Sequence, residues 1–417
     1  MLLDLQITSV FNVRINVVRI KRDFLIINFF SVTVLTVLFS IFFIPAYYAL
    51  PHRFYVLWQY ILMIDGIIAI VLYLVQRKIT VRWVVFTLAL VCYYFISSIL
   101  GKDIEPSRYI FYLFLKTIGF VTLLETSLQW NKERTFKAFI YSSIAMCTIN
   151  YISFLRYRNI VGGMLHGQHE VGEAGQTTQH WFFFNHDNYT AFIYIACLSI
   201  LWFYALESDR LLYKIYAVVF SFLTLYMYFD LWSVTALIGT VLFLGICFLS
   251  FNIQIRAFLS KVITFHSACV VGVCFCLAII FLNASGWYAR AVKILGKSGT
   301  SGLRGIIWNR AMIHIPHSPL VGYGCEQDSV TILKLTFNHC HNFILQIIYT
   351  GGFFALIFFI LFIVLCETKG RKIGSACILT SAIAVLFLLS TFDWYLSCPI
   401  MFAPFIFYAN CNKNFLR

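Results

Sequence analysis

Charged residues are scarce in this sequence. They make up 12% of the 417 residues, whereas the apolar set makes up 61%. A soluble globular domain typically contains about 25% charged residues, so this composition excludes an ordinary water-soluble globule. The sequence therefore predicts one integral membrane bundle rather than two or three soluble domains.

A cleavable signal peptide is not expected at the start of the sequence. Residues 1–23 are polar and basic, and the apolar stretch that follows is too long for a signal h-region. A surface for nucleic acid is not expected either, despite the net charge of +14. The basic residues form short clusters between apolar runs, as the positive-inside rule predicts for a membrane protein.

Zinc-binding motifs are also lacking. The spacing of His314, His317, His339 and Cys340 matches no standard zinc pattern, so no metal site and no cofactor are expected. Most of the 13 cysteines lie inside apolar spans, where they behave as small hydrophobic residues. Cys325 and Cys340 lie in a long polar segment, where a disulfide and two free thiols are the alternatives.

Apolar runs recur along the chain at the length of roughly 20 residues that a helix needs to cross the hydrocarbon core. The predicted fold is all-α, a polytopic bundle of about 12 transmembrane helices. The predicted spans are Phe24–Ala49, Phe54–Val75, Val81–Leu100, Ser107–Leu128, Phe136–Leu155, Tyr189–Leu206, Tyr213–Phe229, Leu231–Phe251, Val262–Leu282, Asn342–Cys366, Ile373–Leu389 and Trp394–Ala409.

The distribution of Lys and Arg predicts the orientation of this bundle. Most of the basic residues outside the longest loop fall on one side if the N-terminus is cytoplasmic, so both termini are expected there. The predicted parts are a cytoplasmic segment 1–23, one transmembrane domain 24–410 and a cytoplasmic tail 411–417. Two long outer loops, 156–188 and 283–341, are the expected location of functional residues.

The second outer loop contains residues that suit phosphate and proton chemistry. His341 lies directly before the tenth span, where an imidazole can take a proton near neutral pH. Arg304 and Arg310 are permanent cations with forked donors that suit phosphate oxygens. A base and phosphate-binding cations are what glycosyl transfer from a diphosphate-linked donor needs. Two alternatives stay open: His341 and Asn342 cap the tenth helix, and Arg304 extends toward lipid headgroups.

Three segments of this loop resemble the O-antigen ligase/polymerase superfamily. They are Arg304–Trp308, the turn Pro319–Gly324 and the pair His341-Asn342. The pattern His-Asn, nine residues, Gly, two residues, Gly is matched through Gly352, with Ala355 at its last position.

Two further segments are compared with landmarks of the same superfamily. Phe184–Asn188 resembles a family turn before the sixth span. The family's Ser-Arg pattern at the eighth span is not matched, because Val234 stands in the place of the arginine. Arg156 and Arg158 are the candidate replacements for that cation.

The resemblance implies a membrane glycosyltransferase in the inner (cytoplasmic) membrane of a bacterial cell. It would polymerise undecaprenyl-diphosphate-linked repeat units on the outer face of the membrane. A ligase that passes the finished glycan to lipid A core or another acceptor is the alternative. A transporter or lipid flippase is a third reading, which the lack of an obvious internal repeat disfavours.

The resemblance also implies the site and the partners. His341 and Arg304 would be catalytic, and no metal would be needed. The partners would be the polyprenyl-diphosphate-linked donor, a glycan acceptor, the lipid bilayer, a flippase and a chain-length regulator, but no nucleic acid. The expected substrate contacts are Arg310, Asn342, Arg156, Arg158, Asn188, His339 and Tyr323.

Two ionisable residues stand out inside the predicted spans. Asp65 lies in the second span and Lys116 in the fourth, at similar depths. Charges in lipid are costly and usually paired, so an Asp65–Lys116 ion pair is predicted, with a proton or substrate pathway as the alternative.

Overall fold

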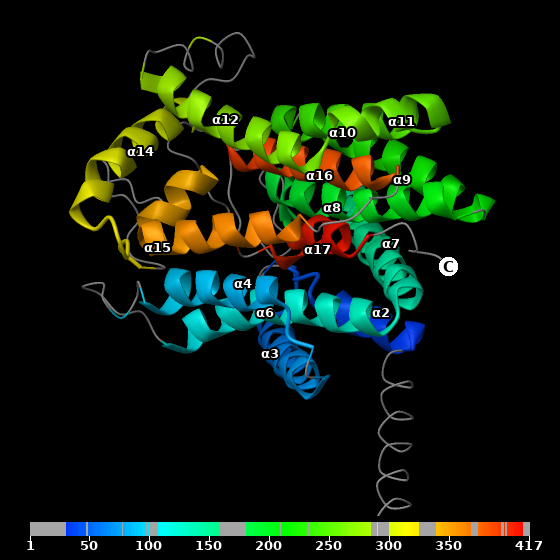
Figure 1. Cartoon of the computed structure of the whole chain (residues 1–417), viewed down its shortest axis with the longest axis horizontal. Coiled ribbons are helices and arrows are strands. Elements are labelled where there is room, and N and C mark those ends of the chain that lie inside the picture. The colour runs from blue at the N-terminus through cyan, green and yellow to red at the C-terminus, as the bar shows by residue number, and fades with distance from the viewer. Residues whose placement is uncertain are drawn as a thin grey trace, which may run out of the picture.

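The protein is a bundle of helices (Figure 1), and its described residues also include a short β-hairpin. The computed structural model describes residues 31–46, 49–76, 78–96, 99, 107–157, 181–208, 210–231, 233–284, 290, 300–324, 339–367, 374–392, 396 and 398–411. The α-helices are α2 (Val32–Ile41), α3 (His52–Gln76), α4 (Val81–Val91), α6 (Ser107–Trp130), α7 (Lys132–Tyr157), α8 (Asp187–Glu207), α9 (Leu211–Asp230), α10 (Val234–Leu249), α11 (Ile253–Val262), α12 (Phe265–Ala284), α14 (Thr300–His314), α15 (Phe343–Cys366), α16 (Ala376–Ser390) and α17 (Ala403–Asn410). The other elements are the π-helix η1 (Cys92–Ile96), the 3-10 helices η2 (Ile315–His317) and η3 (Pro399–Phe402), and the strands β1 (Trp181–Phe182) and β2 (Asn185–His186).

Each predicted span contains a helix, but the helices differ in length. Among the described residues, 7 helices are long and apolar enough to cross a membrane. These are α3, α6, α7, α8, α9, α12 and α15. The remaining predicted spans correspond to shorter apolar helices: α2, α4 with η1, α10, α16, and η3 with α17. The all-helical membrane class is therefore confirmed, whereas the number of about 12 spans is not.

The long helices differ in how much of their surface is buried inside the bundle. α6 and α8 are almost completely buried among other helices, whereas α3 and α12 are largely exposed. The exposed side chains of α3 include the apolar residues Phe54, Ile64 and Val71. Such a continuous apolar exterior fits a lipid environment, in which helices satisfy their own backbone polar groups.

The close approach of α3 and α6 corrects the predicted Asp65–Lys116 pair. These helices cross at two glycines, where a Cβ on Gly119 would lie 2.6 Å from the Cα of Gly66. Asp65 is buried, and neither of its carboxylate oxygens has a hydrogen-bond partner in the structure. The Lys116 Nζ instead lies 5.2 Å from the ring centre of Tyr112. The predicted pair is therefore wrong: the carboxylate of Asp65 is buried without a hydrogen-bond partner, and Lys116 lies over an aromatic ring.

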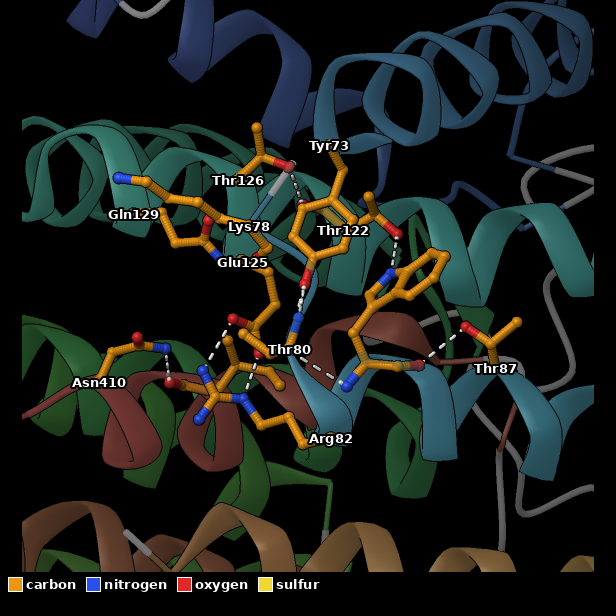
Figure 2. A network of polar contacts seen from close by, with 12 residues as sticks. Tyr73, Lys78, Thr80, Arg82, Thr87, Thr122, Glu125, Thr126, Gln129 and Asn410 are labelled. Carbon is orange, nitrogen blue, oxygen red and sulfur yellow. Dashed lines mark hydrogen bonds and ion pairs between the residues drawn. The ribbon is translucent and has the colours of Figure 1, made fainter. Parts of the chain in front are cut away.

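A buried ion pair joins α4 to α6 (Figure 2). Arg82 donates from Nη2 to Glu125 Oε2 over 2.8 Å, and from Nε to the second carboxylate oxygen. Tyr73 of α3 joins this region, because the Thr80 N–H donates to its hydroxyl over 2.8 Å. The sequence analysis singled out only Asp65 and Lys116 as ionisable residues inside the predicted spans, and it overlooked Glu125 within the fourth span. The network fastens three helices at one end of the bundle.

The β-hairpin lies within the predicted first outer loop, directly before α8. Its strands are antiparallel, with Trp181 opposite His186 and Phe182 opposite Asn185. The tip is fixed to the bundle, because Ala46 N–H donates to Phe183 O over 2.8 Å and Phe184 N–H donates to Asn150 Oδ1 over 3.0 Å. The hairpin thereby sets where α8 begins.

Candidate functional site

The predicted second outer loop contains a helix, α14, which the sequence reading did not predict. Its second turn packs against the end of α12, where Asn283 Nδ2 donates to Gly305 O over 3.1 Å. A Cβ at position 305 would lie 2.2 Å from Asn283 Oδ1. Only glycine therefore allows this contact, which holds α14 against the transmembrane helices.

One face of α14 is buried and carries the first predicted catalytic residue. Ile307, Trp308 and Ala311 are buried at helical spacing. Arg304 lies one turn before Trp308 on the same face and is half-buried. The Trp308 indole donates from Nε1 to Cys340 O over 2.9 Å. Arg304 therefore lies on the side of α14 that faces the segment before α15.

That segment, His339–Asn342, is termed the His341 turn. His341 is half-exposed and has a φ of 47°, a left-handed conformation that is uncommon for residues other than glycine. Its ring centre lies 4.0 Å from that of His339. The structure thus brings both predicted histidines together at the start of α15, and a half-exposed imidazole there can accept a proton from a bound hydroxyl.

Asn342 is the N-cap of α15, as one of the two sequence readings predicted. Its Oδ1 accepts from Ile344 N–H over 3.1 Å and from Leu345 N–H over 3.2 Å. Its Nδ2 donates to Thr391 O at the end of α16 over 3.3 Å. The side chain is fully buried. Capping therefore accounts for Asn342, and its predicted contact with substrate stays a prediction.

Gln346 holds the backbone of the His341 turn and was missed by the sequence reading. Its Oε1 accepts from Cys340 N–H over 2.6 Å. Its Nε2 donates to Thr350 Oγ1 over 2.7 Å and lies 3.4 Å from the Tyr93 hydroxyl. Cys340 is consequently held through its N–H by Gln346 and through its carbonyl by Trp308. The available signal was a glutamine one turn after an N-cap asparagine, inside an otherwise apolar span.

Cys340 is a buried free thiol. Burial raises the pKa of Cys340 to about 12, so the thiol stays protonated and unreactive at neutral pH. Cys325, with which a disulfide was one of the two alternatives, lies outside the described residues. Cys340 acts through its backbone: the hydrogen bonds of its N–H and of its carbonyl fix the chain directly before His341.

α15 is broken at Gly352, which has a φ of 67° and a ψ of −172°. The sequence reading had predicted one continuous span. Breaking a helix frees backbone groups that must be satisfied inside a membrane. Here Tyr323 N–H donates to Tyr349 O over 2.8 Å, and Gly324 N–H donates to Thr350 O over 2.9 Å. The carbonyl end of the first half of α15 is thereby capped.

The second half of α15 is capped by the same loop. Phe353 N–H donates to Pro319 O over 2.8 Å, and Phe354 N–H donates to Leu320 O over 3.2 Å. A Cβ on Gly352 would lie 2.2 Å from Leu320 O. The segment Pro319–Gly324, termed the capping loop, therefore fills the break. This contact explains why the sequence pattern pairs that loop with a glycine at position 352.

Tyr323 and Arg310 are predicted substrate contacts, and for both of them that role stays a prediction. The Tyr323 hydroxyl donates to His314 O over 2.8 Å, and its ring stacks on Tyr349. Arg310 is exposed and lies on the opposite face of α14 from Trp308. Burial and the nearby Arg310 charge lower the pKa of His314, so that imidazole is neutral at neutral pH. Tyr323 thus belongs to the joint between α14 and the capping loop, whereas Arg310 is exposed on α14.

Asn188 meets another segment that the sequence comparison singled out. Its Oδ1 accepts from Ser233 Oγ over 3.1 Å, which joins the start of α8 to the N-cap of α10. Arg156, a candidate replacement cation, is exposed in the last turn of α7. Arg158, the other candidate, lies outside the described residues. Asn188 and Ser233 form a joint of their own, separate in sequence from the His341 turn.

Comparison with known proteins adds one finding. No curated protein matches the chain. A family match covers residues 219–360, which include α10, α12, α14, the capping loop, the His341 turn and the break in α15. The model that residues 219–360 match is described as O-antigen ligase, and this match confirms the predicted resemblance of the chain to the O-antigen ligase/polymerase superfamily.

Proposed function

We propose that this protein is a polymerase of lipid-linked glycans. It joins undecaprenyl-diphosphate-linked repeat units into a surface polysaccharide on the outer face of the bacterial cytoplasmic membrane. Both termini are then cytoplasmic, and α14 and the His341 turn lie on the outer side. A flippase would deliver the repeat units, and a chain-length regulator would limit the product.

In the proposed reaction His341 is the general base. Its imidazole removes the proton from a hydroxyl of the acceptor sugar, and the oxygen attacks the anomeric carbon of the donor. The bond from that carbon to the diphosphate oxygen breaks, so the leaving group departs with an added negative charge. Arg304 stabilises this charge through forked N–H donors. The chemistry needs no metal, because a permanent cation supplies the charge stabilisation.

One observation carries this proposal. The His341 turn is held from three directions by Trp308 of α14, by Gln346 of α15 and by Thr391 after α16. These contacts hold the residues on both sides of His341 in place, while the imidazole itself is not fully buried. A histidine that merely packed in the core would be buried instead. Arg304 lies on the same face of α14 as Trp308, so in this proposal it is the cation that acts with His341.

Ligation is the second candidate function, because the matching family is described as O-antigen ligase. The same base and cation would then act on a finished glycan and a different acceptor. The departures at Val234 and Ala355 from the ligase pattern favour the polymerase.

The test is the length profile of surface polysaccharide from cells that lack the protein. Glycan capped at a single repeat unit supports the polymerase. Full-length polymer that accumulates on the lipid carrier supports the ligase instead. An unchanged ladder of chain lengths contradicts both and favours transport.

A further inference from the structure

An apolar cavity of about 330 Å³ lies between α12, α15, α16 and η3 with α17. Its wall includes Phe343, Ile347, Leu356, Phe359 and Phe387, and Ser390 is its only residue with a polar side chain. Protein interiors normally have few voids larger than a water molecule. A void of this size, at this position, is therefore a feature that needs a cause.

The cause is the break in α15. Phe343 and Ile347 come from the first half of this helix, whereas Leu356 and Phe359 come from the second half, and all four line the same cavity. The two halves run in different directions (Figure 1). Because the capping loop satisfies the backbone groups at the break, the bend is a stable part of the fold. The cavity it encloses is termed the elbow cavity.

The elbow cavity opens at the surface of the bundle, and one of its wall residues directly follows the His341 turn in the chain. Two of its wall residues are exposed, Leu277 of α12 at 39% and Ile360 of α15 at 50%, so it reaches the surface that faces lipid. Phe343, another wall residue, directly follows Asn342 in the chain. A molecule that entered the cavity from the bilayer would therefore lie near the segment that carries His341.

The chemistry of the wall selects the kind of ligand. It offers almost no hydrogen-bonding group, so it cannot orient a sugar or a phosphate. A hydrocarbon chain needs no such group and gains free energy from apolar and aromatic contact. The volume is at the lower end of the range for ligand pockets, about 300–1,000 Å³. The cavity can therefore hold only the first part of a long chain.

We propose that the elbow cavity binds the first isoprene units of the polyprenyl tail of the lipid-linked donor. This inference rests on the proposed function, because the tail is joined to the diphosphate that must lie beside His341 and Arg304. Seating the tail there fixes the distance between the reacting carbon and the base. The rest of the tail extends into the bilayer past Ile360.

Two neighbouring residues of α15 provide a matched pair of variants. Leu356 lines the cavity, whereas Ile357 is exposed on the outside of the same turn and is not part of the wall. Leu356→Trp fills the cavity, and Ile357→Trp adds the same bulk toward lipid. The full-length protein is purified in detergent, and binding of undecaprenyl diphosphate is measured by retention in native mass spectrometry.

Leu356→Trp is expected to weaken this binding roughly tenfold or more, because the added ring occupies the space of the tail. Ile357→Trp is expected to bind as the unaltered protein does. Equal binding by both variants overturns the elbow cavity as the tail site but leaves the proposed function standing. No retention of undecaprenyl diphosphate by the unaltered protein overturns both.

A second measurement covers the case in which Leu356→Trp does not fold. A polyprenyl diphosphate with a photoreactive group near the diphosphate is cross-linked to the unaltered protein, and the labelled peptides are mapped. Labelling within 343–366 and 386–405 is expected, and labelling confined to other helices overturns the proposal. Excess phosphatidylglycerol should not prevent the labelling. If it does, the cavity holds ordinary lipid chains and the proposal fails.

Discussion

At the scale of single residues, the backbone of His341 is the most informative feature of the site. The left-handed backbone conformation costs most residues other than glycine roughly 1–2 kcal/mol of free energy. The structure holds His341 at a φ of 47° and supplies three contacts around it that keep it there. Residues held in sparsely populated backbone regions cluster at functional sites. The conformation therefore supports a role for the imidazole beyond helix capping, which Asn342 already provides.

Replacing His341 with glycine separates the side chain from the backbone. Glycine adopts a positive φ readily, so His341→Gly should fold and melt at the same temperature as the unaltered protein. Loss of a general base typically reduces a rate by roughly 10²–10⁴-fold, and the rate of glycan transfer should fall by that factor. Near-normal transfer by this variant would show that activity requires the backbone conformation of the turn but not the imidazole.

Gln346 acts through its neighbours as a positioning residue. In Gln346→Leu the Cys340 N–H loses its acceptor, and an unsatisfied buried group costs about 1–3 kcal/mol. The variant should lower kcat roughly tenfold with little change in KM for the donor, because the base loses its position and the donor contacts remain.

Gln346→Glu is the conservative control for that experiment. It keeps an acceptor for Cys340 N–H, and the hydroxyls of Thr350 and Tyr93 can rotate to donate to it. It should therefore recover part of the lost kcat. If KM rose instead of kcat falling, or if glutamate rescued nothing, Gln346 would be a packing residue only.

At the scale of elements, α15 and the capping loop behave as one unit. The loop supplies two N–H donors and two carbonyl acceptors to the broken helix. The backbone hydrogen-bonding groups of each segment are therefore satisfied only by the other. Because α14 leads directly into this loop through η2, the break couples the helix that carries Arg304 to the helix that begins after His341. The relative placement of the two proposed catalytic residues depends on this joint.

Gly352→Ala tests the joint. Its Cβ would collide with the Leu320 carbonyl, and the positive φ adds strain of about 1–3 kcal/mol. The variant should melt at a lower temperature and should also lose transfer activity. Gly245→Ala in α10 is the control, because a Cβ at position 245 meets nothing within 4 Å. That variant should be neutral or slightly stabilised, since alanine favours a helix more than glycine does. Equal melting temperatures for the two variants would contradict the coupling.

The positions of the helices along the chain could be predicted from the sequence better than the bends within them. Apolar runs placed a helix in every predicted span, because burial in lipid demands length and hydrophobicity alone. The bend at Gly352 could not be derived from the same runs, since hydropathy does not report backbone direction. α14 was missed because its alternation of Arg304, Trp308 and Arg310 with apolar residues gives only a weak membrane signal.

At the scale of the whole molecule, one end of the bundle depends on the ion pair between Arg82 and Glu125. Both side chains are buried, and removing one partner of such a pair leaves an uncompensated charge that costs about 3–5 kcal/mol. Arg82→Gln and Glu125→Gln should each strongly lower the melting temperature in detergent. The double variant should be less destabilised than the sum of the two, because no lone charge remains.

The exposed pair Glu133 and Lys137 on α7 is the control for this cycle. Exposed ion pairs contribute about 0–1 kcal/mol, so the same substitutions there should hardly change the melting temperature. Fully additive losses at Arg82 and Glu125 would mean that the two side chains do not stabilise the bundle as a pair.

Charges inside the bundle were the hardest feature to predict from the sequence. Asp65 and Lys116 agree in depth, yet similar depth does not fix where each side chain points, and the structure shows no hydrogen bond from Asp65. Glu125 carried a usable signal, because an acidic residue in an apolar span calls for a cation nearby. The capping role of Asn342 was one of the two alternatives that the sequence left open, and it could be named because capping depends only on local sequence.

The most direct measurement is glycan transfer by the purified protein in liposomes that contain a lipid-linked repeat unit. The unaltered protein should produce a ladder that grows by one repeat unit at a time, and His341→Gly should produce none while still binding the donor. No product from the unaltered protein, or the same ladder from His341→Gly, would contradict catalysis at the His341 turn.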